Sequence, residues 1–238
     1  IITRRFFVFE NGLKIMAEAK LPRSSSSLIP QHELNINLDI SSYKIENVYG
    51  DLKVYVQQNG RKDNMKILTE PKSVTGNTIK YNIVRDILFE AGNEYRGLDF
   101  RSLKMPTPQI VKTYEDSNGL NIDLMRDQNR SRTNYITYAD LNGKFQIINR
   151  DPIIRSSHIE ADYAWVHFTL PASFPQSQGA VYIMGAFNDW RFNESNKMIY
   201  DYDRQNYEGK LFLKQGFYNY VYAYLPNGKE DSDDDMPF

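Results

Sequence analysis

Residues that could carry chemistry are few and scattered along this chain. The three histidines, His32, His158 and His167, are too far apart in sequence to form a metal-binding pair at short spacing, and cysteine is absent. A chain without cysteine has no disulfides, thiolate metal ligands or thiol nucleophile. His167 lies in the run WVHFTL with no G-x-S-x-G or comparable nucleophile motif in the chain, so we interpret it as structural. We therefore expect no catalytic residues, no metal, no cofactor and no enzymatic activity.

Acidic residues cluster in DSDDDM (231–236), and carboxylates are the ligands that calcium prefers. A calcium loop places its ligands at alternating positions and needs a glycine near the sixth position, which this run lacks. We interpret the cluster as a solvated acidic linker.

Paired charges occur in the segment AGNEYRGLDFRS (91–102). In an extended strand Arg96 shares a face with Glu94, and Arg101 shares a face with Asp99, because the members of each pair are two residues apart. The two arginines could contact a partner, or they could brace a turn from within through bidentate hydrogen bonds to the carboxylates. The internal network is the favoured interpretation.

Arg61 lies beside Lys62 in QQNGRKDN, directly after Asn59-Gly60, which is a strong hairpin signal. The arginine is a candidate partner contact at the tip of this hairpin. A solvated turn is the favoured alternative.

Trp190 ends the run VYIMGAFNDW (181–190) and is one of only two tryptophans in the chain. Two interpretations are open for its indole ring. An exposed ring could stack on a sugar, an interaction of about 1–3 kcal/mol by analogy with base stacking. A buried ring would anchor its own loop against the edge of the fold.

The elements that must position these residues are strands. Apolar and polar residues alternate in runs such as LNINLDI (34–40), AWVHFTL (164–170) and GKLFLKQG (209–216). Tyrosine (17) and phenylalanine (13) are plentiful, as half-buried pleated surfaces prefer. Helical spacing is confined to a short candidate at residues 82–90. The pattern predicts an all-β fold of antiparallel sheets.

Overall charge and hydropathy argue against nucleic-acid binding and against a transmembrane helix. The formal net charge of −1 provides no broad basic field for a nucleic-acid backbone. No run of 18 apolar residues is present, so no transmembrane helix is expected.

The segment NRDPIIRSS (149–157) resembles a domain boundary, because Asp151-Pro152 follows a strand-like run. We expect an irregular antiparallel β domain over residues 11–152 and an immunoglobulin-like sandwich over residues 153–238. Within the first of these, the polar stretch 106–135 is interpreted as a long loop, and residues 23–30 as another.

The second domain resembles the early-set sandwiches of glycogen- and starch-binding modules. The resemblance rests on the pattern G-x-F-N-x-W, which is formed by Gly185, Phe187, Asn188 and Trp190. It implies that Trp190 and Asn188 lie at the sugar site. However, the second platform tryptophan expected after Asn227-Gly228 is missing, and Val221 replaces a lysine that sugar-binding members often have. The loop-anchor interpretation of Trp190 is therefore favoured.

The strand-like run GFYNYVYAYL (216–225) has two unlike faces. Its tyrosines share one face, which the early-set resemblance turns toward the core, while Phe217, Val221 and Leu225 share the other. An apolar outer face suggests either contact with a partner or coverage by the first domain of the same chain.

Taken in order, TRRFFVFE, VYVQQNGRKDN, AGNEYRGLDFRS, YADLNGKF and GAFNDW resemble the plug protein family of the Bacteroidetes type IX secretion system. The resemblance implies a periplasmic protein at the outer membrane that occludes the periplasmic mouth of the translocon barrel. It also implies that residues 1–10 are the last strand or linker of a preceding domain, and that the chain continues after residue 238. A carbohydrate-binding module acting through Trp190 is the alternative.

Steric occlusion requires shape and a large interface, on the order of 1,200–2,000 Å², rather than a titrating residue. The candidate contacts for a partner or ligand are Trp190, Asn188, Phe217, Val221, Arg96, Arg101 and Arg61.

Overall fold

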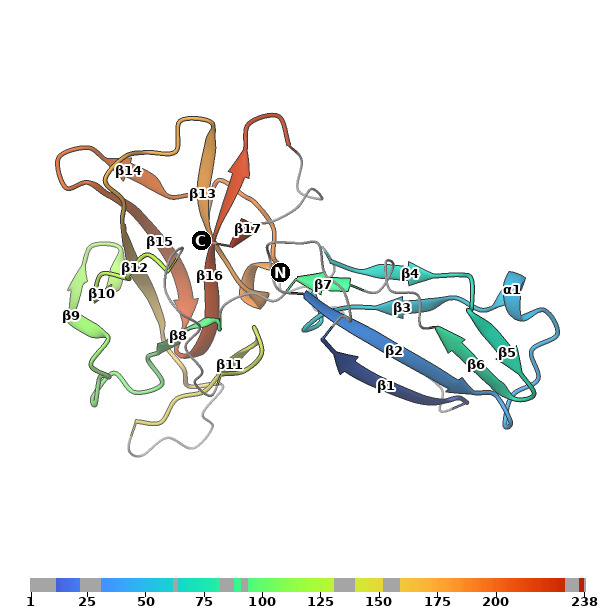
Figure 1. Cartoon of the computed structure of the whole chain (residues 1–238). Helices are drawn as coiled ribbons and strands as arrows, with labels where there is room; N and C mark the ends of the chain where they lie inside the picture. The colour runs from blue at the N-terminus through green and yellow to red at the C-terminus, as the bar shows by residue number, and fades with distance from the viewer. Residues whose placement is uncertain are drawn as a thin grey trace. The chain divides into compact units, whose positions relative to one another are not determined.

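The computed structural model describes residues 12–21, 31–61, 64–81, 88–90, 94–130, 140–151, 159–229 and 236–237. The fold is nearly all β, which confirms the predicted class (Figure 1). The chain divides into two compact units, one of residues 1–60 and 64–92 and the other of residues 61–63 and 93–238. No helix among the described residues has the length and hydropathy needed to cross a bilayer.

The first unit is a small sheet faced by a hairpin. The sheet has the order β1-β2-β6-β5, and β7 also pairs with β2, while β3 and β4 pair with each other. Its elements are β1 (Lys14–Lys20), β2 (Gln31–Asp39), α1 (Val48–Asp51), β3 (Val54–Val56), β4 (Lys66–Leu68), β5 (Ser73–Thr75), β6 (Thr78–Tyr81) and β7 (Leu88–Glu90).

The alternation in β2 explains why this small unit folds. Ile36 and Leu38 point inward and pack with Leu68, Ile79 and Tyr81. The asparagines between them lie on the opposite face, as a strand with period two requires.

The second unit is a two-sheet sandwich. One sheet has the order β14-β15-β12-β10-β9, and the other has the order β11-β16-β13, with β8 and β17 also paired to β16. The pairing of β10 with β12 is parallel. Its elements are β8 (Arg96–Asp99), β9 (Ile110–Asp116), β10 (Gly119–Leu124), β11 (Phe145–Ile147), β12 (Tyr163–Pro171), β13 (Gly179–Met184), the 3₁₀ turn η1 (Ala186–Asn188), β14 (Ile199–Asp201), β15 (Asn206–Lys214), β16 (Gly216–Pro226) and β17 (Met236–Pro237).

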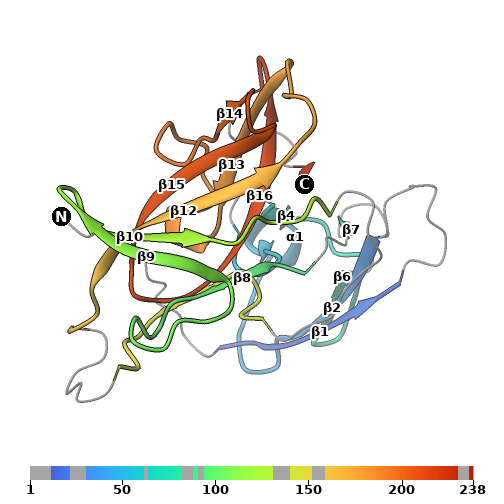
Figure 2. The same ribbon diagram turned by 90° about the vertical axis from the view of Figure 1, so that its left-hand side faces the viewer.

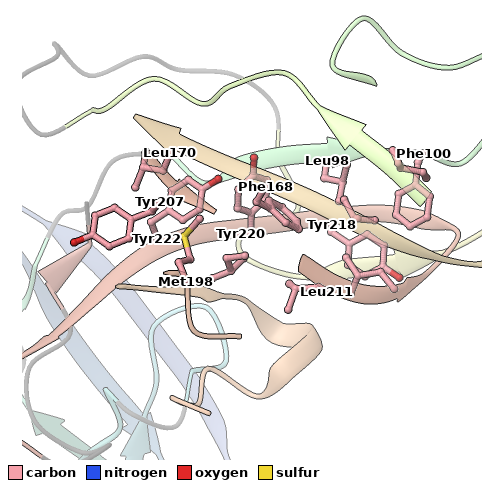
Figure 3. Close-up of a cluster of buried hydrophobic side chains, with 14 of the residues drawn as sticks. Leu98, Phe100, Phe168, Leu170, Met198, Tyr207, Leu211, Tyr218, Tyr220 and Tyr222 are labelled. Carbon is pink, nitrogen blue, oxygen red and sulfur yellow. The ribbon is translucent and has the colours of Figure 1, made fainter. Parts of the chain in front are cut away.

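The core of the second unit lies between its two sheets and is rich in aromatic rings (Figure 3). From β12, Ala164, Val166, Phe168 and Leu170 all point inward. From β16, the tyrosines of the alternating run meet them, and the Phe168 ring contacts the Tyr220 ring edge-on with centroids 5.2 Å apart. The tyrosine face of residues 216–225 is therefore the core face, as the sequence predicted.

The predicted domain boundary at residue 152 is wrong. Strands β8 and β11 both pair with β16, and β10 pairs with β12, so residues 93–151 help to complete the C-terminal sandwich. Asp151 is a brace inside this unit, because its carboxylate accepts hydrogen bonds from Ser102 and Gln215. The division between the units falls near residue 92. The local sequence pattern does not reveal which strands pair when they lie so far apart in the chain.

The predicted long loop at residues 106–135 is also wrong where the chain forms two strands, between residues 110 and 124. Strands β9 and β10 form an antiparallel hairpin there, with Gly119 opposite Asp116. The polar residues that suggested a loop lie on the solvated face and edge of a sheet. Several other expectations fall outside the described residues, namely those for 1–10, 23–30, most of 82–90 and nearly all of the acidic run 231–236.

Candidate functional site

The loop that carries Trp190 is held in one shape by its own amides. The Asn188 side chain accepts a hydrogen bond from the Gly185 N–H (3.0 Å) and donates one to the Ile183 carbonyl (2.8 Å). Asn196 is buried and donates to the carbonyls of Ile183 and Arg191, both at 2.9 Å. Asn188, a predicted site residue, is therefore occupied in bracing the loop.

The ring of Trp190 is buried and covered. Only 6 % of the residue is exposed. The Tyr95 ring lies against it, with centroids 5.6 Å apart, and the Arg61 guanidinium carbon lies 4.6 Å from its centroid. A sugar needs an open ring face, so this geometry favours the loop-anchor interpretation. Arg61, a predicted hairpin-tip residue, groups with the second unit and contributes to the cover.

The face of β16 that carries Phe217 and Val221 is partly covered by this chain, and both side chains are half-buried. Val221 packs in a second apolar cluster with Tyr182, Met184 and Trp190. Next along the strand, the buried Asn219 side chain accepts hydrogen bonds from the N–H groups of residues 141 and 143. Phe217 lies under the Arg101 guanidinium, at 5.4 Å. Residues 101, 141 and 143, which contact Phe217 and Asn219, come from the part of the chain expected to form the first domain, whereas the cluster around Val221 comes from the C-terminal part itself.

Arg101 forms the predicted internal pair with Asp99. Its Nε and Nη2 atoms donate to the two carboxylate oxygens at 2.8 and 2.5 Å. Burial tends to raise the pKa of Asp99, but the hydrogen bonds from Arg101 outweigh that effect and keep the pKa below its ordinary value. This pair braces the turn after β8.

Arg96 has a partner that the sequence did not reveal. Its guanidinium donates to the Asp127 carboxylate at 3.0 Å and to the Gln128 carbonyl at 2.6 Å. The other Asp127 oxygen accepts hydrogen bonds from the hydroxyls of Tyr220 and Tyr222, both at 2.6 Å. We call these four side chains the Arg96–Asp127 network. It ties the segment after β10 to β8 and β16 and has no exposed reactive group.

Buried tyrosines make the second unit sensitive to alkali. Burial raises the pKa of Tyr218, Tyr220 and Tyr222 above the ordinary value of 10.0. The unfolded chain therefore loses these protons first, so the stability that they contribute is complete below about pH 10 and is lost as pH rises toward their folded-state pKa. We expect the urea midpoint to fall steeply above about pH 10.

Replacing Tyr222 with Phe should lessen the slope of unfolding free energy against pH by about 1.4 kcal/mol per pH unit, since one titrating proton is removed. Urea titrations between pH 9 and 12 measure this slope, with absorbance at 295 nm following tyrosinate. Tyr202→Phe, which removes the hydroxyl of an exposed tyrosine in the same unit, is the control. Equal slopes for all three proteins would contradict the assignment.

An aromatic surface lies on the outer face of the β12–β15 pair, which faces the viewer in Figure 2. The Phe212 ring stacks on the Tyr163 ring with centroids 5.2 Å apart and contacts the Trp165 ring at 4.9 Å. Lysine ammonium groups lie over both partner rings, Lys214 over Tyr163 at 5.5 Å and Lys210 over Trp165 at 5.0 Å. We call these five residues the aromatic ladder.

The ladder is accessible to solvent. Phe212 is 53 % exposed and Tyr163 is 47 % exposed. On its flank, the His167 ring is within 2.9 Å of the Asn121 side-chain oxygen, which supports the structural interpretation of this histidine. Among the described residues, no three His, Asp or Glu side chains are grouped so that they could bind a metal ion.

Sequence reasoning missed the ladder because it depends on register. The alternation in AWVHFTL and GKLFLK shows which residues share a face of each strand. Only the pairing of Trp165 with Phe212, and of Tyr163 with Lys214, brings the two strands' outward residues together. The signal in the sequence that could have revealed the ladder is the presence of aromatic residues on the outward face of both strands.

Comparisons with known proteins describe the fold rather than an activity. No family model matches the chain, and no curated protein matches it. A similar solved structure is the 2.30 Å crystal structure of a hypothetical protein from Parabacteroides merdae ATCC 43184. It is 32 % identical, with a TM-score of 0.82 over 92 % of this chain. This chain spans 54 % of the length of that protein.

Proposed function

We propose that this chain belongs to a binding protein without enzymatic activity that acts by steric contact. By its resemblance to the plug family, its partner is the periplasmic mouth of an outer-membrane secretion barrel. The observation that carries this proposal is the aromatic ladder. Tyrosine, tryptophan and phenylalanine are enriched in protein–protein interfaces, where a few large rings dominate the binding energy.

The arrangement of the rings favours a protein partner over a sugar. Rings that stack on one another and lie under lysines have part of their faces occupied, which leaves less ring face for a sugar to stack on. An apolar ridge of this kind suits a complementary protein surface. The carbohydrate alternative rested on Trp190, and the buried ring of that residue gives it no support.

Rigidity of the sandwich also supports a steric role. The ladder lies on two nine-residue strands that are paired along their whole length. A ligand-binding surface on a regular sheet loses little conformational entropy when it is covered. A stable contact would extend beyond the ladder, since specific interfaces bury about 1,600 Å² in total.

The proposal is tested with the full-length protein and the purified barrel. We expect Phe212→Asp to weaken binding at least about tenfold, because it places a charge in the centre of the interface. The matched control is Ile67→Asp, an exposed apolar residue of the first unit. Binding is measured by surface plasmon resonance. If the wild-type protein does not bind the barrel, the plug role is rejected; if both variants bind equally, the ladder is not the contact.

A further inference from the structure

Two further exposed aromatic residues lie at one end of the sandwich, away from the ladder rings. Two connections meet there, the β12–β13 loop (172–178) and the β14–β15 turn (202–205) (Figure 1). The Ala172 N–H donates a hydrogen bond to the Gln205 carbonyl at 3.2 Å, which joins the two connections. Phe174 is 79 % exposed in the loop, and Tyr202 is 75 % exposed in the turn. We call Phe174 and Tyr202 the aromatic tip.

The loop that displays Phe174 is fixed on both sides of that residue. The Tyr200 hydroxyl donates to the Ala172 carbonyl at 2.8 Å. On the other side, the Gln176 N–H donates to the Tyr207 hydroxyl at 2.6 Å. A proline directly follows Phe174 in the sequence, and its ring restricts the backbone further.

A large apolar ring exposed on a fixed loop is unfavourable in water and favourable for binding. The side chain loses little conformational freedom when a pocket covers it, so most of the burial contributes to affinity. Aromatic anchors of this kind are frequent binding hot spots.

Charges around the tip indicate the kind of partner. Three carboxylates surround one arginine, since Asp201, Asp203 and Glu208 lie near Arg204 in the turn and the adjoining strands. Arg204 is held by Glu208 at 2.9 Å and by Asp201 at 3.7 Å. The tip is therefore locally negative. An anionic membrane surface would repel it, because such surfaces attract basic segments.

We propose that the aromatic tip is a docking surface for a protein, and that the partner offers an apolar pocket rimmed by lysine or arginine. Charge complementarity of this kind steers association and selects the partner. The tip lies on connections between strands, and the aromatic ladder lies on the outer face of a sheet. The two surfaces can therefore be tested separately.

The test places the photo-crosslinking residue p-benzoylphenylalanine at position 174, and separately at position 202, in the full-length protein in living cells. We expect both positions to crosslink to the same protein, in peptides that combine apolar residues with lysine or arginine. Asp203→Lys should lower the yield at position 174 at least about threefold, because it reverses a charge in the turn that is hydrogen-bonded to the loop of that residue. The same probe at the exposed Tyr49 of the first unit is the control and should not label that protein.

Three outcomes would overturn the inference. They are crosslinks to lipid only, labelling of many proteins in proportion to their abundance, and a yield that Asp203→Lys leaves unchanged. The result is separable from the plug proposal. If both positions crosslink to the same protein and that protein is not a barrel, the docking surface is supported and the plug role is not. Barrel binding without crosslinks at positions 174 and 202 would support the plug role and count against the docking surface.

Discussion

Replacing Arg96 with Met is expected to lower the free energy of unfolding of the second unit by about 3–5 kcal/mol, because it leaves a largely buried carboxylate without its cation. The Arg96 side chain is only 5 % exposed, and it alone supplies the charged contact to Asp127 among the described residues. Loss of the guanidinium also leaves the Gln128 carbonyl without its donor. The two tyrosine hydroxyls remain, but neutral donors compensate a carboxylate less well than a cation does.

Tryptophan fluorescence isolates this effect. Trp165 and Trp190, the two tryptophans of the chain, both lie in the second unit, so urea unfolding followed by fluorescence reports that unit. Arg101→Met is the matched control, because its pair with Asp99 is more accessible and should contribute only about 1 kcal/mol. In an Asp127→Asn background, Arg96→Met should be clearly less costly, since no buried charge is left unpaired. Equal, small losses for both arginine variants would contradict a special role for the network.

Many strands of this fold were predictable from local pattern, but their partners were not. Alternation in residues 164–170 and 209–216 predicted β12 and β15, because one face of each strand is buried in the core. The pairing of β8 with β16 joins residues more than 110 positions apart, and nothing in either strand specifies it. The local signal at Asp151-Pro152, which follows a strand-like run, therefore placed the boundary too late in the chain.

The candidate site shows the same division between local and long-range information. Arg101 and Asp99 are two residues apart, so their pair was predictable from strand geometry. Arg96 has an equally close carboxylate in Glu94, yet its partner is Asp127, which lay in a stretch interpreted as a loop. Trp190 was ambiguous because its type and its motif suit both a sugar platform and a loop anchor. Only its burial separates the two.

Replacing Trp190 with Ala is expected to lower the free energy of unfolding of the second unit by about 3–5 kcal/mol, as for other large buried aromatic side chains. The ring fills the space between Tyr95 and the cluster formed by Tyr182, Met184 and Ala223. Trp165→Ala is the control, because that ring is only partly buried on the outer face, and we expect a loss of about 1 kcal/mol. Circular dichroism follows unfolding here, since each variant removes a fluorophore.

An anchor and a sugar platform place opposite demands on this ring. A platform must be exposed before the ligand arrives, so its truncation removes binding and leaves stability nearly intact. An anchor is covered at all times, so its truncation lowers stability and there is no sugar binding to lose.

In a Trp165→Phe variant, fluorescence comes from Trp190 alone. We expect a blue-shifted emission that acrylamide quenches weakly and gluco-oligosaccharides do not change. A saturable change with sugar, together with little loss of stability in Trp190→Ala, would instead identify Trp190 as a platform, because the ring must then leave its cover of Arg61 and Tyr95 to bind.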